Sequence, residues 1–359
     1  MHLERLRVIN LRNIEELELS LQPGINLFIG PNGAGKTSIL EAAYLLSHAR
    51  SFRRGNTETL IHRGSEATTV TASIKKTDGT VSLGLARTNS GWEARVNHAA
   101  VQNLGNVLRE FALVCFEPGS HALIAGSSQE RRQFLDWGLF HVEPEFLTVA
   151  RRYRRVLQQR NAALKQMADD AELDIWDNQL AEAGEPMNTA RRVYFSRFSV
   201  ELTQALAQFL PELGRADASL SAGWSEGITL VETLKQCRGR DRMRGHTTRG
   251  PHRADWGIQF QHAPLREHLS RGQEKLCALA CVLAQASHHA KSSNDWPVIA
   301  LDDLASELDI AHQQTVAEML IGAGAQVLVS GVEIPPSLKR VVADQAVFHV
   351  EHGRLRGLL

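Results

Sequence analysis

The 359-residue sequence has few cysteines, no long apolar run and no excess of charge of either sign. Its apolar stretches are all shorter than the roughly 18 residues that a membrane-spanning helix needs, which argues against a membrane protein. The first residues lack the apolar core and the cleavage site of a secretory signal, so we expect a cytoplasmic protein. The four cysteines have no CxxC spacing and the histidines no paired spacing, so neither a disulfide framework nor a zinc site is expected.

The balance of charge restricts how this chain could bind a polyanion. Lys and Arg total 40, and Asp and Glu also total 40, so binding to nucleic acid must depend on a local basic surface. The composition, with 43% apolar and 22% charged residues, is typical of an ordinary soluble globular protein. A chain of this length exceeds the size at which single cores stop growing, so we expect two lobes.

The N-terminal part of the sequence is typical of an α/β fold. Residues 25–29 form a short apolar run of the kind found in buried parallel strands, and a glycine-rich turn and a helical pattern through residue 48 follow it. Apolar residues alternate with polar ones between residues 68 and 101, with Asp78-Gly79 as a hairpin signal, which predicts an antiparallel sheet.

The middle of the chain is predicted to be helical. Helix formers dominate from about residue 129 to residue 210, where we expect Pro186 to break or bend the helical run and Pro211 to end it. Short apolar runs at 298–301 and 327–329, separated by a helical pattern, indicate a return to the α/β fold. The sequence therefore predicts an α/β lobe made of residues 1–116 and 255–359, interrupted by a mainly helical second lobe at 117–254.

The glycine-rich segment after the first buried strand carries the clearest chemical signal. It fits the pattern G-x-x-x-x-G-K-[ST] and lies between a predicted strand and a predicted helix, as a phosphate-binding P-loop requires. Backbone N–H groups and the helix N-terminus would surround phosphates, Lys36 would reach the β- and γ-phosphates, and the Thr37 hydroxyl would bind Mg²⁺. The predicted ATP-binding residues are Gly30, Pro31, Asn32, Gly33, Ala34, Gly35, Lys36, Thr37 and Ser38.

Two adjacent acids follow the apolar run at 298–301. This is the Walker B pattern, in which Asp302 would hold Mg²⁺ and Asp303 would polarise an attacking water. An apolar run that ends in acids is common, but beside a P-loop it predicts a site that binds and hydrolyses ATP. We therefore take Lys36 and Asp303 as the candidate catalytic residues, and Thr37 and Asp302 as the candidate magnesium ligands.

Further segments resemble motifs of the ABC-type ATPases. Residues 269–275 read LSRGQEK and are similar to the signature motif, and Ser306 and Asp309 are similar to the D-loop. An early P-loop, a helical insertion, and a late signature and Walker B resemble the SMC and RecF class more than the transporters. Segments at 11–13, 41–42, 131–137 and 250–255 resemble RecF motifs, and the resemblance to the RecF family spans nearly the whole chain.

The resemblance implies an ABC-type ATPase head, with a P-loop core and an antiparallel β subdomain, and a mainly helical second lobe. It implies that Ser270, Arg271, Gly272 and Gln273 contact the γ-phosphate bound by another protomer, so that ATP holds a homodimer together. It also implies a role in DNA repair, recombination and replication restart, with binding to double-stranded, gapped or single-stranded DNA. RecR, together with RecO, would be the partner in loading RecA, and this activity would support the SOS response.

Two departures from the ABC pattern affect the expected activity. The acid after the magnesium aspartate is usually Glu, whereas Asp303 is one methylene shorter, so we expect a slow, DNA-stimulated ATPase that acts as a switch. The switch histidine after the later strand is missing, and Ser330 is a candidate to replace it in part. Residues 116–118 are the positional candidate for the loop that senses the γ-phosphate, although the usual glutamine is absent.

Arginines supply the local basic surface that binding to DNA would require. Their crowding at the start of the helical lobe, without interleaved aromatic residues, favours contact with the DNA backbone over base stacking. An ordinary solvated helix face would show the same pattern, so both interpretations stay open. The DNA-binding candidates are Arg50, Arg53, Arg131, Arg132, Arg151, Arg152, Arg154 and Arg155, with Arg54, Arg160 and a second cluster at 238–253 as further candidates.

Two other functions are compatible with a P-loop in this sequence. A nucleotide-binding subunit of an ABC transporter would be indicated by binding to a membrane permease. A nucleotide-gated scaffold without significant hydrolysis would be indicated by a negligible rate of phosphate release on DNA.

Overall fold

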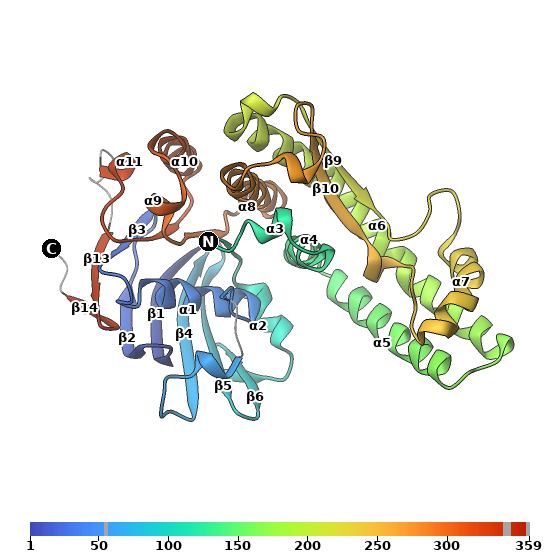
Figure 1. Ribbon diagram of the computed structural model, residues 1–359. Helices are drawn as coiled ribbons and strands as arrows, with labels where there is room; N and C mark the ends of the chain where they lie inside the picture. The colour runs from blue at the N-terminus through green and yellow to red at the C-terminus, as the bar shows by residue number, and fades with distance from the viewer. Residues whose placement is uncertain (54–56, 340–345, 357–359) are drawn as a thin grey trace. The chain divides into compact units, whose positions relative to one another are not determined.

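The computed structural model describes residues 1–53, 57–339 and 346–356 (Figure 1). The chain forms two compact units. The first unit consists of Met1–Ser120 and Ala278–Leu359, and the second of His121–Cys277. Among the helices of the described residues, none combines the length and the apolar character that crossing a bilayer requires.

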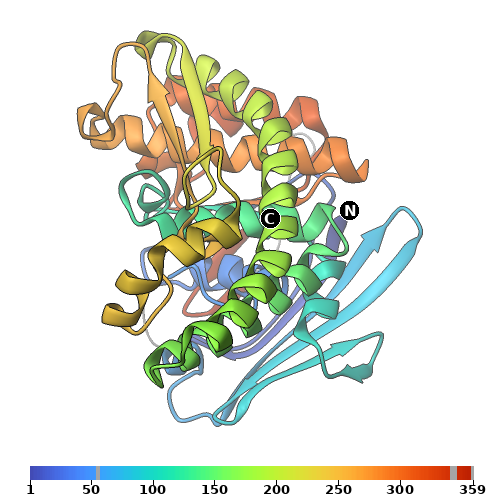
Figure 2. The same cartoon turned by 90° about the vertical axis from the view of Figure 1, so that its right-hand side faces the viewer.

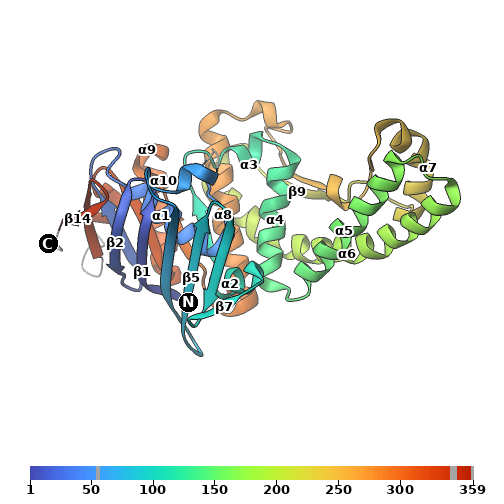
Figure 3. The ribbon, with the colours of Figure 1, turned by 90° about the horizontal axis from the view of Figure 1, so that it is seen from below.

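The described part of the first unit contains two six-stranded sheets. One is antiparallel, in the order β2-β1-β4-β5-β6-β7, and Figure 3 shows β1 and β2 side by side in it. It consists of β1 (His2–Leu11), β2 (Ile14–Ser20), β4 (Ala67–Lys76), β5 (Gly79–Thr88), β6 (Gly91–Val96) and β7 (Ala99–Val101). The other sheet, in the order β14-β13-β3-β12-β11-β8, is parallel except for its edge strand β14. It consists of β3 (Ile25–Ile29), β8 (Leu113–Phe116), β11 (Val298–Leu301), β12 (Val327–Gly331), β13 (Ala346–Glu351) and β14 (Arg354–Arg356).

Helix α1 is buried on nearly every side, because side chains of both sheets pack in one apolar cluster with it. The cluster joins Leu40 and Leu45 of α1 to Leu6 of β1 and Phe28 of β3, none of which is exposed. Full burial of one such side chain contributes about 1.5–3 kcal/mol, so this cluster fixes the start of α1 relative to the ends of β3 and β11. The helices of this unit are α1 (Lys36–His48), α2 (Leu104–Glu110), α9 (Leu304–Glu307), α10 (Ile310–Ala323) and α11 (Pro336–Lys339), with a 3-10 turn at Thr57–Leu60.

The second unit is mainly helical and is organised along one 40-residue helix, α6. Figure 2 shows α6 in yellow-green with α5 alongside it. The helices are α3 (Ala122–Ala125), α4 (Ser128–Val142), α5 (Phe146–Lys165), α6 (Asp170–Phe209) and α7 (Leu230–Arg244), with 3-10 turns at Pro211–Leu213, Pro251–Arg253 and Arg266–His268. The strands β9 (Ala216–Ser221) and β10 (Asp255–Phe260) form an antiparallel pair. Helix α8 (Arg271–Ser293) begins in this unit and continues in the first.

The predicted fold class is confirmed. Helix α6 continues through Pro186, so of the predicted break or bend no break occurs, and it ends at Phe209, just before Pro211, as predicted. The boundaries of the second unit differ from those predicted. The second unit extends to Cys277, beyond the predicted boundary at residue 254. The reason is that β10 pairs with β9, which keeps residues 255–260 with the helical unit. Its other boundary, at His121, lies four residues after the predicted start at 117.

Candidate nucleotide site

The P-loop lies between β3 and α1, as the sequence predicts. Gly33 and Gly35 have φ angles of 78° and 112°, a backbone region that side chains other than glycine rarely adopt. A Cβ atom on Gly30 would lie 2.1 Å from the carbonyl oxygen of Val350. Glycine is therefore required at these three positions, because the loop both turns sharply and packs against the backbone of β13.

The side chain of Lys36 lies over the loop that precedes it. Its Nζ donates to the carbonyl oxygens of Gly30 and Pro31, at 2.8 Å each. Burial lowers the pKa of Lys36, while the nearby charges of Asp303 and Asp302 oppose that shift. The Lys36 amine is thus held at the loop by two neutral carbonyl acceptors. The charged oxygens of a phosphate would form stronger hydrogen bonds with it.

The predicted magnesium ligands Thr37 and Asp302 lie in contact. Asp302 follows β11, and its Oδ1 accepts hydrogen bonds from Thr37 Oγ1 at 2.9 Å and from Ser330 Oγ at 2.5 Å. Burial raises the pKa of Asp302, since the ionised carboxylate is poorly solvated there. A carboxylate and a hydroxyl are hard oxygen ligands of the kind that Mg²⁺ prefers. A bound cation would also stabilise the buried carboxylate of Asp302, so this pair fits Mg²⁺.

Asp303 lies beside this pair with an unusual backbone conformation. Its φ and ψ are 54° and 41°, in the left-handed region, and its N–H donates to Ser330 Oγ at 3.0 Å. Together with Lys36 it lines a cavity of about 670 Å³. Residues 32–38 of the P-loop, Asp302 and Ser330 also line this cavity. The P-loop and the Walker B motif therefore form one site.

Two neighbouring residues, Arg12 and Asn13, support the P-loop, a role that the sequence did not reveal. Asn13 Nδ2 donates to the Gly33 carbonyl at 3.0 Å, and Asn13 Oδ1 accepts from Ser38 Oγ at 3.0 Å. Arg12 forms a two-pronged ion pair with the fully buried Glu41, at 3.0 and 2.7 Å. In the sequence, residues 11–13 and 41–42 are similar to family motifs, but the resemblance did not indicate what these residues do.

The signature residues lie at the start of α8, in the second unit. Ser270 Oγ accepts from the Gln273 N–H at 3.3 Å, and Gln273 Oε1 accepts from the Ser270 N–H at 3.0 Å. These reciprocal bonds cap the helix, while Ser270, Arg271 and Gly272 are exposed.

The D-loop residues and the loop that follows β8 belong to the first unit. Ser306 Oγ donates to the Asp303 carbonyl at 3.0 Å, and Asp309 caps α10 by accepting from the His312 N–H. Pro118 lines the cavity, whereas the Glu117 carboxylate accepts from the Gly119 N–H at 2.6 Å.

Arg131 is not available for binding DNA, which corrects its selection as a candidate. Its side chain is only 5% exposed and forms a two-pronged ion pair with Asp255, at 2.7 and 2.9 Å. The neighbouring candidate Arg132 is half-buried and donates to the Ala254 carbonyl. Burial lowers the pKa of Arg132. Both arginines hold α4 to the chain around β10. Arg131 is therefore no longer a candidate for binding DNA, and the role of Arg132 is mainly structural.

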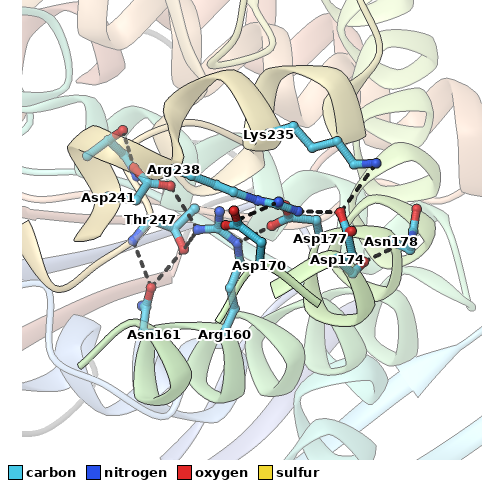
Figure 4. Close-up of polar contacts among 11 residues, drawn as sticks. Arg160, Asn161, Asp170, Asp174, Asp177, Asn178, Lys235, Arg238, Asp241 and Thr247 are labelled. Carbon is cyan, nitrogen blue, oxygen red and sulfur yellow. Dashed lines mark hydrogen bonds and ion pairs between the residues drawn. The ribbon is translucent and has the colours of Figure 1, made fainter. Parts of the chain in front are cut away.

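Arg160 and Arg238 are also structural, because they belong to an ion-pair network among α5, α6 and α7 (Figure 4). The side chain of Arg160 is fully buried and donates to Asp177 at 2.7 Å and to Asp241 at 2.8 Å. Arg238 contacts Asp177 and Asp174 in the same network. Neither arginine presents its charge to solvent as a DNA contact would require.

Most of the remaining candidates are exposed, although Arg242 of the second cluster is half-buried and pairs with Asp170 at 2.8 Å. On α5 the exposed arginines are Arg151, Arg152, Arg154 and Arg155, two on each side of the buried Tyr153. Arg152 lies 3.3 Å from the equally exposed Glu182. In the first unit Arg50 is exposed, and so is Arg53, which lines the cavity and lies 3.9 Å from Glu41. Arg54 lies outside the described residues.

Comparison with known proteins gives matches along nearly the whole chain. The family model described as RecF/RecN/SMC N terminal domain matches residues 2–354. The DNA replication and repair protein RecF of Stenotrophomonas maltophilia (strain R551-3) is 46% identical over 361 residues, covering 99% of each chain. The protein of the same name from Psychromonas ingrahamii is 36% identical over 357 residues, again covering 99% of each.

Solved structures show the same relationship. The recombination mediator protein RecF in complex with ATPrS, of the RecFOR pathway, has a TM-score of 0.87 at 25% identity and covers 100% of this chain and 98% of its own. An Smc head bound to the C-winged helix domain of ScpA has a TM-score of 0.59 at 15% identity, with 100% and 98% covered, and shares the fold. By the extent and identity of these matches, the chain belongs to the RecF family of the RecF/RecN/SMC class.

Proposed function

We propose that the cavity of the first unit binds ATP with Mg²⁺ and hydrolyses it slowly, and that the chain uses this cycle as a RecF-type DNA repair protein. The contact of Thr37 with Asp302 carries the proposal, because it joins the P-loop and Walker B in one site. The two relatives described above are named DNA replication and repair proteins, which favours this function over the transporter alternative.

The residues of the cavity have distinct roles in this proposal. Lys36 turns from the carbonyls of Gly30 and Pro31 to the β- and γ-phosphate oxygens, because its ammonium group forms stronger hydrogen bonds with charged oxygens. Thr37 and Asp302 hold Mg²⁺, which when bound supplies positive charge to the phosphates. Asp303 accepts a proton from the attacking water as the new bond to the γ-phosphorus forms and the bond to the ADP oxygen breaks. The products are ADP and inorganic phosphate.

The rest of the chain connects this cycle to DNA. Ser270, Arg271, Gly272 and Gln273, at the exposed start of α8, contact the γ-phosphate held by a second copy of the chain, so ATP favours a homodimer. Ser306 and Asp309 are the D-loop of that arrangement. The exposed arginines of α5, with Arg50 and Arg53, neutralise phosphates of double-stranded, gapped or single-stranded DNA. Family resemblance assigns RecR, with RecO, as the partner for loading RecA in the cytoplasm.

Replacement of Lys36 by alanine tests the nucleotide site. Binding of a fluorescent ATP analogue and ATP-dependent dimerisation should both be lost, because the phosphates lose their charged partner. The matched control is Lys75→Ala, which removes an exposed lysine on β4 that does not line the cavity. Unchanged nucleotide binding and dimerisation in Lys36→Ala would contradict the proposal.

A further inference from the structure

Asp303 has a backbone conformation that requires support. Its φ of 54° and ψ of 41° lie in the left-handed region, which residues with a Cβ rarely adopt. Such conformations persist where the surrounding structure holds them, and they are concentrated at functional sites. In this site the backbone N–H of Asp303 has a specific acceptor, the hydroxyl of Ser330, at 3.0 Å.

Ser330 lies in β12 and is 1% exposed. A serine hydroxyl has one hydrogen to donate, and Ser330 donates it to Oδ1 of Asp302 at 2.5 Å. Its oxygen at the same time accepts the N–H of Asp303. One buried hydroxyl therefore joins the residue that would hold the metal to the residue that would take the proton of the attacking water.

Thr37 donates to the same Oδ1 atom of Asp302, at 2.9 Å. If the Thr37 hydroxyl turns to Mg²⁺, Ser330 is the donor that still orients this carboxylate. Since the single hydrogen of Ser330 is already used on Asp302, none remains for the γ-phosphate. This argues against Ser330 as a direct substitute for a phosphate-sensing histidine.

We propose that Ser330 is a positioning residue that holds Asp303 in its left-handed conformation and orients the Asp302 carboxylate for Mg²⁺. The inference rests on the proposed function of the cavity as an ATP site. It differs from that function in locating the control of both acids in β12, whose Gly331 carbonyl also accepts the Gly30 N–H of the P-loop at 3.3 Å.

The test compares Ser330→Ala, Ser330→Thr and a matched control, Ser47→Ala. Ser47 is also 1% exposed, and its hydroxyl accepts the Leu113 N–H at 3.0 Å, away from the residues that line the cavity. The affinity for a fluorescent ATP analogue is measured with Mg²⁺ and with EDTA, together with single-turnover hydrolysis and the melting temperature of the free protein.

Ser330→Ala should keep the affinity measured in EDTA, because the P-loop is intact. The gain in affinity that Mg²⁺ provides, and the hydrolysis rate, should each fall about tenfold, the size expected when a hydrogen bond to a charged group is lost. Ser330→Thr keeps a hydroxyl and should restore most of both. Ser47→Ala should lower only the melting temperature. If Ser330→Ala does not fold, Ser330→Cys, with its weak donor, should show the same losses.

An unchanged Mg²⁺ effect and an unchanged hydrolysis rate in Ser330→Ala or Ser330→Cys would overturn the inference. An equal loss in Ser47→Ala would also overturn it, because the effect would then come from general destabilisation. The proposed function would survive either result as long as Lys36→Ala abolishes nucleotide binding. If Lys36→Ala also binds and hydrolyses ATP normally, the proposed function itself fails.

Discussion

Replacing Arg160 by methionine should destabilise the helical unit by about 3 kcal/mol, because it leaves buried carboxylates without a cation. The side chains of Arg160, Asp177 and Asp241 are all 0% exposed, and Arg160 joins the two acids at 2.7 and 2.8 Å. Methionine has a similar length and fills much of the same volume, so loss of charge pairing dominates over loss of packing.

The magnitude follows from the partners that remain. Removing one member of a buried ion pair typically costs about 3–5 kcal/mol. After the change Asp177 still has Arg238, at 2.6 Å, and Asp241 still accepts from the N–H and the hydroxyl of Thr248. Both acids therefore keep some stabilisation, and we expect the lower end of that range. For a unit of this size the loss corresponds to a fall in melting temperature of about 6–12 °C.

Differential scanning calorimetry measures the effect, with Arg155→Met as the matched control on the same helix. Arg155 is exposed, so its replacement should change stability by at most about 0.5 kcal/mol. Adding Asp241→Asn to Arg160→Met should recover part of the loss, because a neutral amide costs less to bury without a cation than a carboxylate does. A loss below about 1 kcal/mol in Arg160→Met would refute the reasoning that this network is a buried charge cluster.

The local phosphate-binding motif could be located from sequence because its residues are adjacent. Residues 30–37 fall between a strand and a helix, and the structure confirms that placement. The acids after residue 301 were a weaker signal by themselves, because an apolar run that ends in acids is common. The P-loop in the same chain identified them as Walker B, and the structure places them directly after the buried strand β11. In both cases the chemistry depends on neighbours in the chain, which a pattern can record.

The prediction of DNA-binding arginines was wrong in part for the opposite reason, because it depended on contacts between residues far apart in the sequence. Charge in the sequence does not tell whether a side chain is exposed, and the partners that bury these arginines are distant. Arg131 pairs with Asp255, which lies 124 residues later, and Arg160 pairs with Asp241, which lies 81 residues later. The hydrogen bond from the Asp303 N–H to Ser330 of β12 joins residues that are 27 positions apart in the sequence. Only the fold brings such pairs together, so only the structure separates DNA candidates from structural ion pairs.

Three further predictions concern the catalytic acid, the DNA surface and the composite site. Asp303→Asn should keep ATP binding, because Asp302 remains, while phosphate release slows and the dimer persists longer on DNA; loss of nucleotide binding would mean that the two acids are misassigned. Replacing Arg154 and Arg155 by alanine should weaken DNA binding without changing the melting temperature. The slope of the logarithm of the binding constant against the logarithm of salt concentration should become shallower by about two. An unchanged slope in a salt titration would contradict their role. Ser270→Arg should leave ATP binding to the monomer intact but block dimerisation, since a bulky cation at the start of α8 obstructs the partner's γ-phosphate. A mixture of Ser270→Arg and Lys36→Ala chains can form a dimer with one intact pocket, made by Lys36 of the first chain and Ser270 of the second. Sedimentation of the mixture with ATP should therefore recover part of the dimer that neither variant forms alone, and normal ATP-dependent dimerisation of Ser270→Arg by itself would defeat the composite-site model.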